Sequence, residues 1–184
     1  MEYKKNFQNA NDKRRNMQIF DRKLKKYFPN YILQSLLATI TLIIILYFEN
    51  IFTSAAVVAS LGATTFIIFA MPGYTTARPR SVVGGHIIGI IVGISCSYIA
   101  FYMQNRNSFF LSQDTLKILI PAISVGLSIF FMVITNTEHP PAAGTALGIT
   151  IQGWSYSTIL VILITISLLS LAKYLLKPWL KDLV

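Results

Sequence analysis

The sequence predicts an all-α protein, a polytopic bundle of transmembrane helices, from its composition, its apolar segments and the placement of its charges. Hydrophobic residues make up 54% of the 184 residues and charged residues only 12%, against roughly 25% in a typical soluble domain. A bilayer core of about 30 Å needs about 20 helical residues, so each long apolar segment is a candidate span. The five segments cover residues 31–48, 51–71, 82–103, 116–134 and 158–176.

The basic residues predict how the chain is oriented. Nine of the 16 Lys and Arg residues precede residue 27, and most of the others lie at Arg78, Arg80 and residues 173–181. The positive-inside rule places such residues on the cytoplasmic face, so we expect a multi-pass protein of the cell membrane with a cytoplasmic N-terminus. Because topology accounts for the net charge of +9, we expect no nucleic-acid partner.

Residues 1–29 are too charged for a signal peptide, which needs an apolar region. Apolar residues recur there at helical spacing between lysines and arginines. The pattern is typical of a basic amphipathic helix on a surface of anionic lipid headgroups. A solvated tail that only orients the protein is the open alternative.

Two prolines interrupt the chain before the last segment. Pro140 and Pro141 lack an N–H group and exclude helix in the residues before them, whereas Pro141 suits the first turn of a new helix. We therefore expect a break, a short helix over residues 142–152 and a turn at Gly153. In a membrane, such irregular backbone needs protein or a water-filled cavity around it.

A shift of 86 residues aligns the two halves of the chain and places residues 61–64 on residues 147–150. Two units of three elements result, and an odd number of crossings in each unit inverts one relative to the other, as in many transporters. We expect six crossings, one of them short or broken. The expected domains are the basic tail 1–29, a transmembrane domain 30–176 with repeat one at 30–103 and repeat two at 115–176, and a cytoplasmic tail 177–184.

Gly85, Gly89, Gly93 and Ser97 form a stripe of small residues at four-residue spacing. Such a stripe lets two helices approach closely. The seam is either internal or a homodimer contact, and the sequence leaves both open.

Catalytic and metal-binding patterns are not visible. Cys96 is the single cysteine, and the two histidines, His86 and His139, are 53 positions apart, which matches no zinc spacing. We expect neither an enzyme nor a bound cofactor or metal.

Two polar stretches are candidates for a solute site. His86 follows Arg80 and the pair Gly84 and Gly85. On one interpretation the arginine attracts anions to the entrance of the solute path and His86 acts as a gate. On the other, His86 is a packing residue and the arginines only set the topology. The second stretch is formed by Asn136, Thr137, Glu138 and His139. Its ionisable groups either lie within the membrane, where such groups are usually functional, or lie at the membrane surface, where Glu138 caps the next helix.

Helix starts are candidates for holding the anion itself. Free amides near residues 142–144 would begin a helix whose positive end can hold a small anion, and Thr53 and Ser54 would begin a second one. Glycines at Gly62, Gly144 and Gly148 would allow close approach, and Thr64, Thr145 and Thr150 would supply hydroxyls.

The stretch TEHPPAAGTAL at residues 137–147 resembles the signature of the HPP family of integral membrane proteins. Residues 62–64, with Pro79, Arg80 and residues 84–86, are similar to the family's other shared block, and the resemblance covers residues 30–176. Arg78 and Ser81 depart from the expected Gln and Asn, and Ala143 and Gly144 look exchanged. Plastid and cyanobacterial relatives are linked to nitrite transport, so the resemblance implies a small-anion permease.

We therefore expect a transporter or channel for a small monovalent anion, nitrite first, with the lipid bilayer, the anion and a second copy as partners. The alternative is a non-transporting scaffold or sensor that dimerises through the glycine stripe and binds lipid or a partner with its basic tail. The expected substrate-binding residues are Gly62, Ala63, Thr64, Arg80, Gly84, Gly85, His86, Asn136, Thr137, Glu138, His139, Pro140, Pro141, Gly144 and Thr145.

Overall fold

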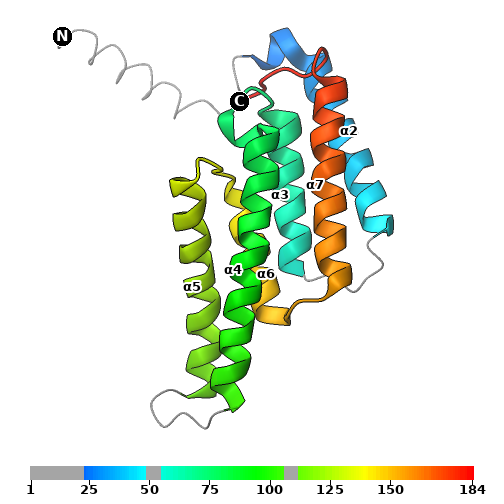
Figure 1. Cartoon of the computed structure of the whole chain (residues 1–184). Coiled ribbons are helices and arrows are strands. Elements are labelled where there is room, and N and C mark those ends of the chain that lie inside the picture. The colour runs from blue at the N-terminus through cyan, green and yellow to red at the C-terminus, as the bar shows by residue number, and fades with distance from the viewer. Residues whose placement is uncertain (1–22, 49–54, 106–111) are drawn as a thin grey trace, which may run out of the picture.

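The computed structural model describes residues 23–48, 55–105 and 112–184, and in them the chain forms a bundle of six α-helices without a strand (Figure 1). The all-α prediction is confirmed. The first helix begins at Leu24, seven residues before the expected segment 31–48 and inside the expected tail 1–29, whereas the other helices begin and end within about four residues of the expected bounds. In chain order they are α2 (Leu24–Phe48), α3 (Ala55–Ala70), the 3₁₀ turn η1 (Thr75–Ala77), α4 (Pro79–Asn105), α5 (Gln113–Ile134), α6 (Pro140–Gln152) and α7 (Tyr156–Leu176).

Four of the helices, α2, α4, α5 and α7, are long and apolar enough to cross a membrane, by length and composition. The other two are short: α3 has 16 residues and α6 has 13. The sequence predicted a short helix at α6, whereas α3 begins directly after residues that the structure does not describe. Pro72 limits α3 at its C-terminal end, because the residue before a proline is pushed out of helical geometry.

Successive helices run in opposite directions along the bundle (Figure 1). The set α2, α3, α4 therefore runs opposite to the set α5, α6, α7, which is the arrangement that an inverted repeat requires. The repeat itself stays a prediction.

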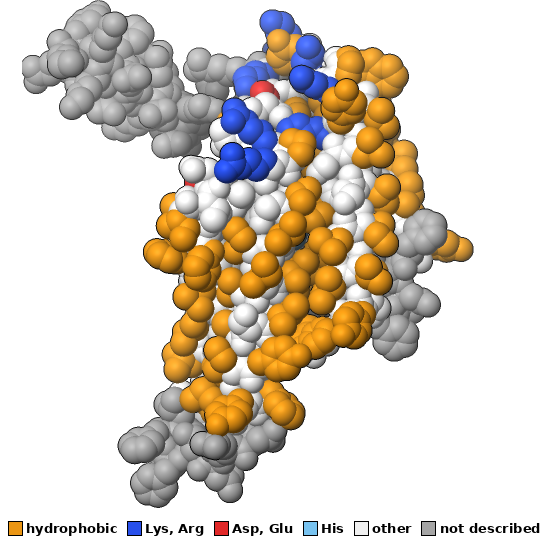
Figure 2. All heavy atoms as spheres, in the orientation of Figure 1, with side chains coloured by type: hydrophobic (Ala, Val, Ile, Leu, Met, Phe, Trp, Pro, Cys, Tyr) orange, Lys and Arg blue, Asp and Glu red, His pale blue; other side chains and the backbone are white. Residues whose placement is uncertain are grey.

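The shortest helix, α6, is the centre of the bundle. It packs against α3, α4 and α5, and seven of its 13 residues are buried. Large apolar side chains on the outer helices are exposed instead, among them Ile118, Phe130 and Leu168, and they cover the side of the bundle (Figure 2). An exposed apolar surface of this extent is typical of a protein surrounded by lipid.

The glycine stripe on α4 faces α6 in the same chain. A Cβ atom added to Gly89 would lie 2.5 Å from the Ala142 carbonyl oxygen, and one added to Gly93 would lie 2.9 Å from Cβ of Ile149. The Ser97 hydroxyl donates to the Ile149 carbonyl oxygen at 3.4 Å. The seam is therefore internal, and the stripe is not a free surface through which a scaffold could dimerise. The oligomeric state stays a prediction.

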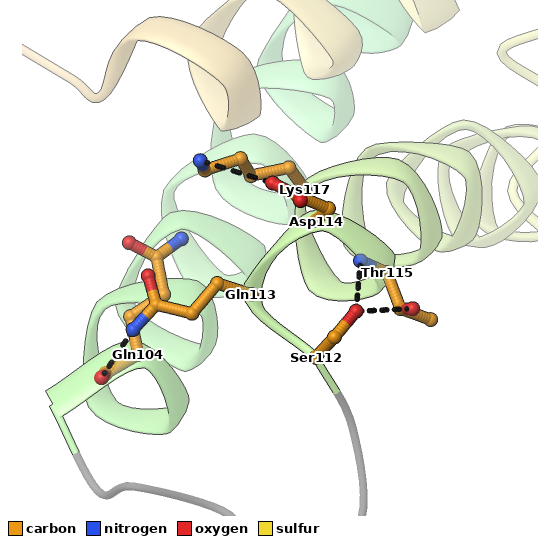
Figure 3. Close-up of polar contacts among 6 residues, drawn as sticks. All are labelled: Gln104, Ser112, Gln113, Asp114, Thr115 and Lys117. Atoms are coloured by element: carbon orange, nitrogen blue, oxygen red, sulfur yellow. Dashed lines mark hydrogen bonds and ion pairs between the residues drawn. The ribbon is translucent and has the colours of Figure 1, made fainter.

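Described Lys and Arg side chains gather at one end of the bundle (Figure 2). Lys117, near the start of α5, is an exception and forms an ion pair with Asp114 at 3.5 Å (Figure 3). Beside this pair, Ser112 caps α5 by accepting from the Thr115 amide, and Gln113 donates to the Gln104 carbonyl oxygen of α4. The uneven distribution fits the positive-inside rule, although the orientation of the chain stays a prediction.

The last residues, expected as a cytoplasmic tail over 177–184, dock onto the basic end of the bundle. The Leu183 amide donates to the Ala70 carbonyl oxygen at 2.9 Å, and the Tyr31 hydroxyl donates to the Leu183 carbonyl oxygen at 2.8 Å. The buried Gln34 side chain of α2 donates to the carbonyl oxygens of Phe69 and Lys181. These bonds tie the C-terminal segment to α2 and α3.

Two of the expectations lie outside the described residues. They concern most of the basic tail 1–29 and the helix start at Thr53 and Ser54.

Candidate functional site

A cluster of five polar side chains lies in the apolar interior, where α3, α4 and the start of α6 meet. Thr64 is in the middle of it: its Oγ1 lies 3.0 Å from Nε2 of His86 and 2.9 Å from Nε2 of His139. The other ring nitrogen of His86, Nδ1, lies 2.9 Å from Oγ1 of Thr145, which lies 2.9 Å from Oγ of Ser60. We call Ser60, Thr64, His86, His139 and Thr145 the histidine cluster.

The histidine cluster is sealed from solvent. Thr64, His86, His139 and Thr145 are all 0% exposed, and Ser60 is 4% exposed. Asp and Glu side chains in the described residues are Asp114, Glu138 and Asp182, and all three are exposed. The cluster is therefore a buried set of hydroxyl and imidazole groups. Among the described residues no carboxylate lies beside it to repel an anion.

Backbone carbonyls fix the directions of its hydrogen bonds. Nδ1 of His139 lies 2.8 Å from the Thr76 carbonyl oxygen of η1, and a carbonyl only accepts, so this nitrogen carries a proton. With both rings neutral, Nε2 of His139 can only accept. The single hydroxyl proton of Thr64 is then shared between this nitrogen and the Ser60 carbonyl oxygen, to which Oγ1 also donates at 3.0 Å. Thr64 in turn accepts from Nε2–H of His86.

The same reasoning fixes the rest of the chain of bonds. A neutral His86 that donates from Nε2 must accept at Nδ1, so the Thr145 hydroxyl donates to it. The Ser60 hydroxyl donates to the Pro141 carbonyl oxygen and also faces Thr145. In this assignment the two neutral rings have opposite tautomers, and the hydroxyl of Thr64 contacts Nε2 of both.

The local sequence explains how these side chains converge. Ser60 and Thr64 are four residues apart, so they lie on one face of α3. His139 is the N-cap of α6, and the two prolines that follow it direct the chain into the bundle. On α4, Gly85 permits the approach, because a Cβ atom there would lie 2.8 Å from Cβ of His139.

Further expected residues support the cluster from outside. Gly84 packs against Thr137, and Gly144 packs against Ser60. Pro141 supplies the carbonyl oxygen that Ser60 contacts. Arg80 is exposed, and its Nη2 donates to the Thr135 carbonyl oxygen at 3.1 Å.

The remaining expected residues lie apart from the cluster. Ala63, Asn136, Glu138 and Pro140 are exposed, and a Cβ atom on Gly62 would meet nothing within 4 Å. The start of α6 also differs from the expectation of free amides at residues 142–144. The Ala142 amide donates to the His139 carbonyl oxygen at 2.9 Å, so it is not free to bind an anion.

Sequence reasoning missed two members of the site. Ser60 was not singled out, although its four-residue spacing from Thr64 in an apolar helix is a visible signal. The Thr76 carbonyl oxygen carries no such signal, because any residue supplies a carbonyl.

The comparison with known families decides the identity of this fold. The family model described as HPP, transmembrane region, matches residues 25–178. The chain belongs to this family. The match includes every residue of the histidine cluster. The HPP motif of the sequence supplies His139 of the cluster and the Pro141 carbonyl oxygen that Ser60 contacts.

Curated relatives of this HPP protein include two transmembrane proteins of Dictyostelium discoideum. One is 34% identical over 90 residues, which is 49% of this chain and 28% of the relative; the other is 33% identical over 88 residues, which is 48% and 25%. The aligned part thus spans about a quarter of each relative. No solved structure matches the chain.

Proposed function

We propose that this HPP family protein is a transporter or channel for a small monovalent anion, with nitrite as the first candidate substrate. The observation that carries the proposal is the histidine cluster at the crossing of the two short helices. Short or broken helices near the middle of the bilayer are where transporters hold their substrates. Nitrite comes from the resemblance to plastid and cyanobacterial relatives.

The hydrogen-bonding groups of the cluster suit a dehydrated anion. Hydroxyl and ring N–H groups are donors, and the cluster offers several of them without a carboxylate. An entering anion would accept hydrogen bonds that Thr145, Ser60 and the rings now make with one another. Because the cluster is sealed in this structure, the proposal requires α3 or α6 to move during each passage.

The rest of the proposal concerns the setting. We place the protein in the cell membrane with its N-terminus in the cytoplasm, because the described basic residues gather at one end. We propose no enzymatic activity. The cluster does place the Thr64 and Thr145 hydroxyls on imidazole nitrogens, but these side chains are all fully buried.

Nitrite uptake into proteoliposomes tests the proposal directly. Purified wild-type protein is expected to give saturable uptake. His139→Ala is expected to reduce uptake to the level of empty liposomes, because the imidazole that contacts Thr64 and the Thr76 carbonyl oxygen is removed. Ser95→Ala is the control, since within the described residues its hydroxyl bonds only to the Ile91 carbonyl oxygen, on an exposed face of α4.

Competition by nitrate, formate and chloride then ranks the substrates. Absence of wild-type uptake for all four anions, with correctly folded protein in the membrane, would contradict the proposed function. Uptake of another anion but not of nitrite would keep the function and replace the substrate.

Arg80→Gln is expected to slow uptake from the basic end by roughly tenfold at low ionic strength, because an exposed cation attracts anions to that end of the bundle. The reduction should shrink as salt is added, since screening removes steering. Arg80→Lys, which keeps the charge, should retain most of the rate. A reduction that does not depend on salt would assign Arg80 a structural role through its bond to Thr135.

A further inference from the structure

A cavity of about 530 Å³ lies at the basic end of the bundle, apart from the histidine cluster. Its walls are the turn after α3, the C-terminal half of α7 and the docked C-terminal segment. The lining residues that matter here are Arg78, Ser170, Lys173, Lys177, Lys181 and Asp182.

The charges in the cavity are strongly unbalanced. Four cationic side chains line it against one carboxylate. The Asp182 carboxylate already accepts from the Gly73 amide at 2.7 Å, and Lys173 donates to the Ala77 carbonyl oxygen at 2.6 Å. Within the described residues, none of the four cations is in an ion pair. The cavity therefore carries a positive charge that its own residues do not neutralise.

A buried hydroxyl gives an independent sign of a missing partner. Ser170 lines the cavity, and its Oγ is buried without a hydrogen-bond partner in the part of the chain that the structure describes. Buried polar groups are nearly always paired. A ligand oxygen in the cavity would supply the partner that Ser170 lacks.

We infer that this cavity binds a phosphate-bearing anion, either the headgroup of an anionic phospholipid or a free phosphate. Lysine and arginine cations with a hydroxyl are the groups that proteins use for phosphate oxygens. Basic pockets between transmembrane helices on the cytoplasmic side are typical sites for anionic headgroups. The volume is in the range of ordinary ligand pockets, far larger than one nitrite ion needs.

The inference does not depend on the proposed transport function, because η1 separates the two sites. The Thr76 carbonyl oxygen accepts from His139 of the cluster, whereas the next carbonyl, that of Ala77, accepts from Lys173 of the cavity. Lys177 and Lys181 make no side-chain hydrogen bond to the cluster, so replacing them tests the cavity alone.

The test compares two double variants that remove equal charge from the same end of the bundle. Lys177→Gln/Lys181→Gln removes two cations from the cavity, and Lys25→Gln/Lys26→Gln removes two exposed cations of α2 outside it. Each full-length protein is placed in phosphatidylcholine nanodiscs with or without phosphatidylglycerol. Native mass spectrometry then measures retained phosphatidylglycerol, and thermal unfolding in inorganic phosphate measures binding of the free ion.

Retention by the wild type and the α2 variant, with about a tenfold weaker affinity in the cavity variant, would support a lipid headgroup. An upward shift of the unfolding temperature by inorganic phosphate, lost only in the cavity variant, would support a free phosphate. Equal loss in both variants, or no binding by the wild type, would overturn the inference.

Ser170→Ala provides a second variant that removes no charge. It is expected to weaken the same binding several-fold without lowering the unfolding temperature of the ligand-free protein, because the hydroxyl has no partner to lose. Unchanged binding by Ser170→Ala, together with unchanged binding by the cavity double variant, would equally overturn the inference.

Discussion

Gly89→Ala should destabilise the folded bundle by about 1–3 kcal/mol, the usual cost of forcing a methyl group into a packed interior. The added Cβ would lie 2.5 Å from the Ala142 carbonyl oxygen. That oxygen belongs to the backbone of α6 and cannot rotate away as a side chain would. The two helices must therefore separate, and thermal unfolding in detergent should show a lower midpoint than that of the wild type.

Gly126→Ala is the matched control for this prediction. Gly126 is also a helical glycine, on α5, but a Cβ atom there would meet nothing within 4 Å. Alanine favours a helix over glycine by about 1 kcal/mol, so this variant should unfold at the same temperature or higher. If the two variants shift the midpoint equally, the close contact between α4 and α6 is not what stabilises the bundle.

Separation of α4 from α6 should also affect uptake. His86 is on α4 and His139 is at the start of α6, so a wider spacing pulls the two rings from their shared hydroxyl. Gly89→Ala is thus expected to lose nitrite uptake at a temperature where Gly126→Ala retains it.

The fold was largely predictable because apolar length and prolines act locally. The spans and the short helix after Pro140 and Pro141 are visible in the sequence. The helix that packs on the glycine stripe was not predictable. Four-residue spacing shows which face of α4 carries small residues, but not which helix packs against that face.

The candidate site was predictable as residue types but not as a cluster. Thr64, His86, His139 and Thr145 were each singled out, yet their meeting depends on the antiparallel crossing of α3 and α6. Immediate neighbours such as Ala63 and Glu138 are exposed instead. Successive helical residues point about 100° apart, and a motif written as consecutive letters hides that difference.

Thr64→Val should abolish nitrite uptake and also lower the unfolding midpoint. Valine keeps nearly the shape of threonine but lacks the hydroxyl that contacts Nε2 of both His86 and His139. Both nitrogens are fully buried, and each buried polar group left without a partner costs about 1–3 kcal/mol. Replacing this one hydroxyl by a methyl group therefore removes the hydrogen bonds that connect His86 with His139.

Two further threonine variants separate this effect from a general loss of hydroxyl groups. Thr64→Ser keeps the hydroxyl and should retain uptake and most of the stability. Thr39→Val removes a hydroxyl that donates only to the Ser35 carbonyl oxygen on the exposed side of α2, so it should change neither. Wild-type uptake by Thr64→Val at equal folded yield would remove the histidine cluster from the anion path, because this hydroxyl contacts Nε2 of both rings.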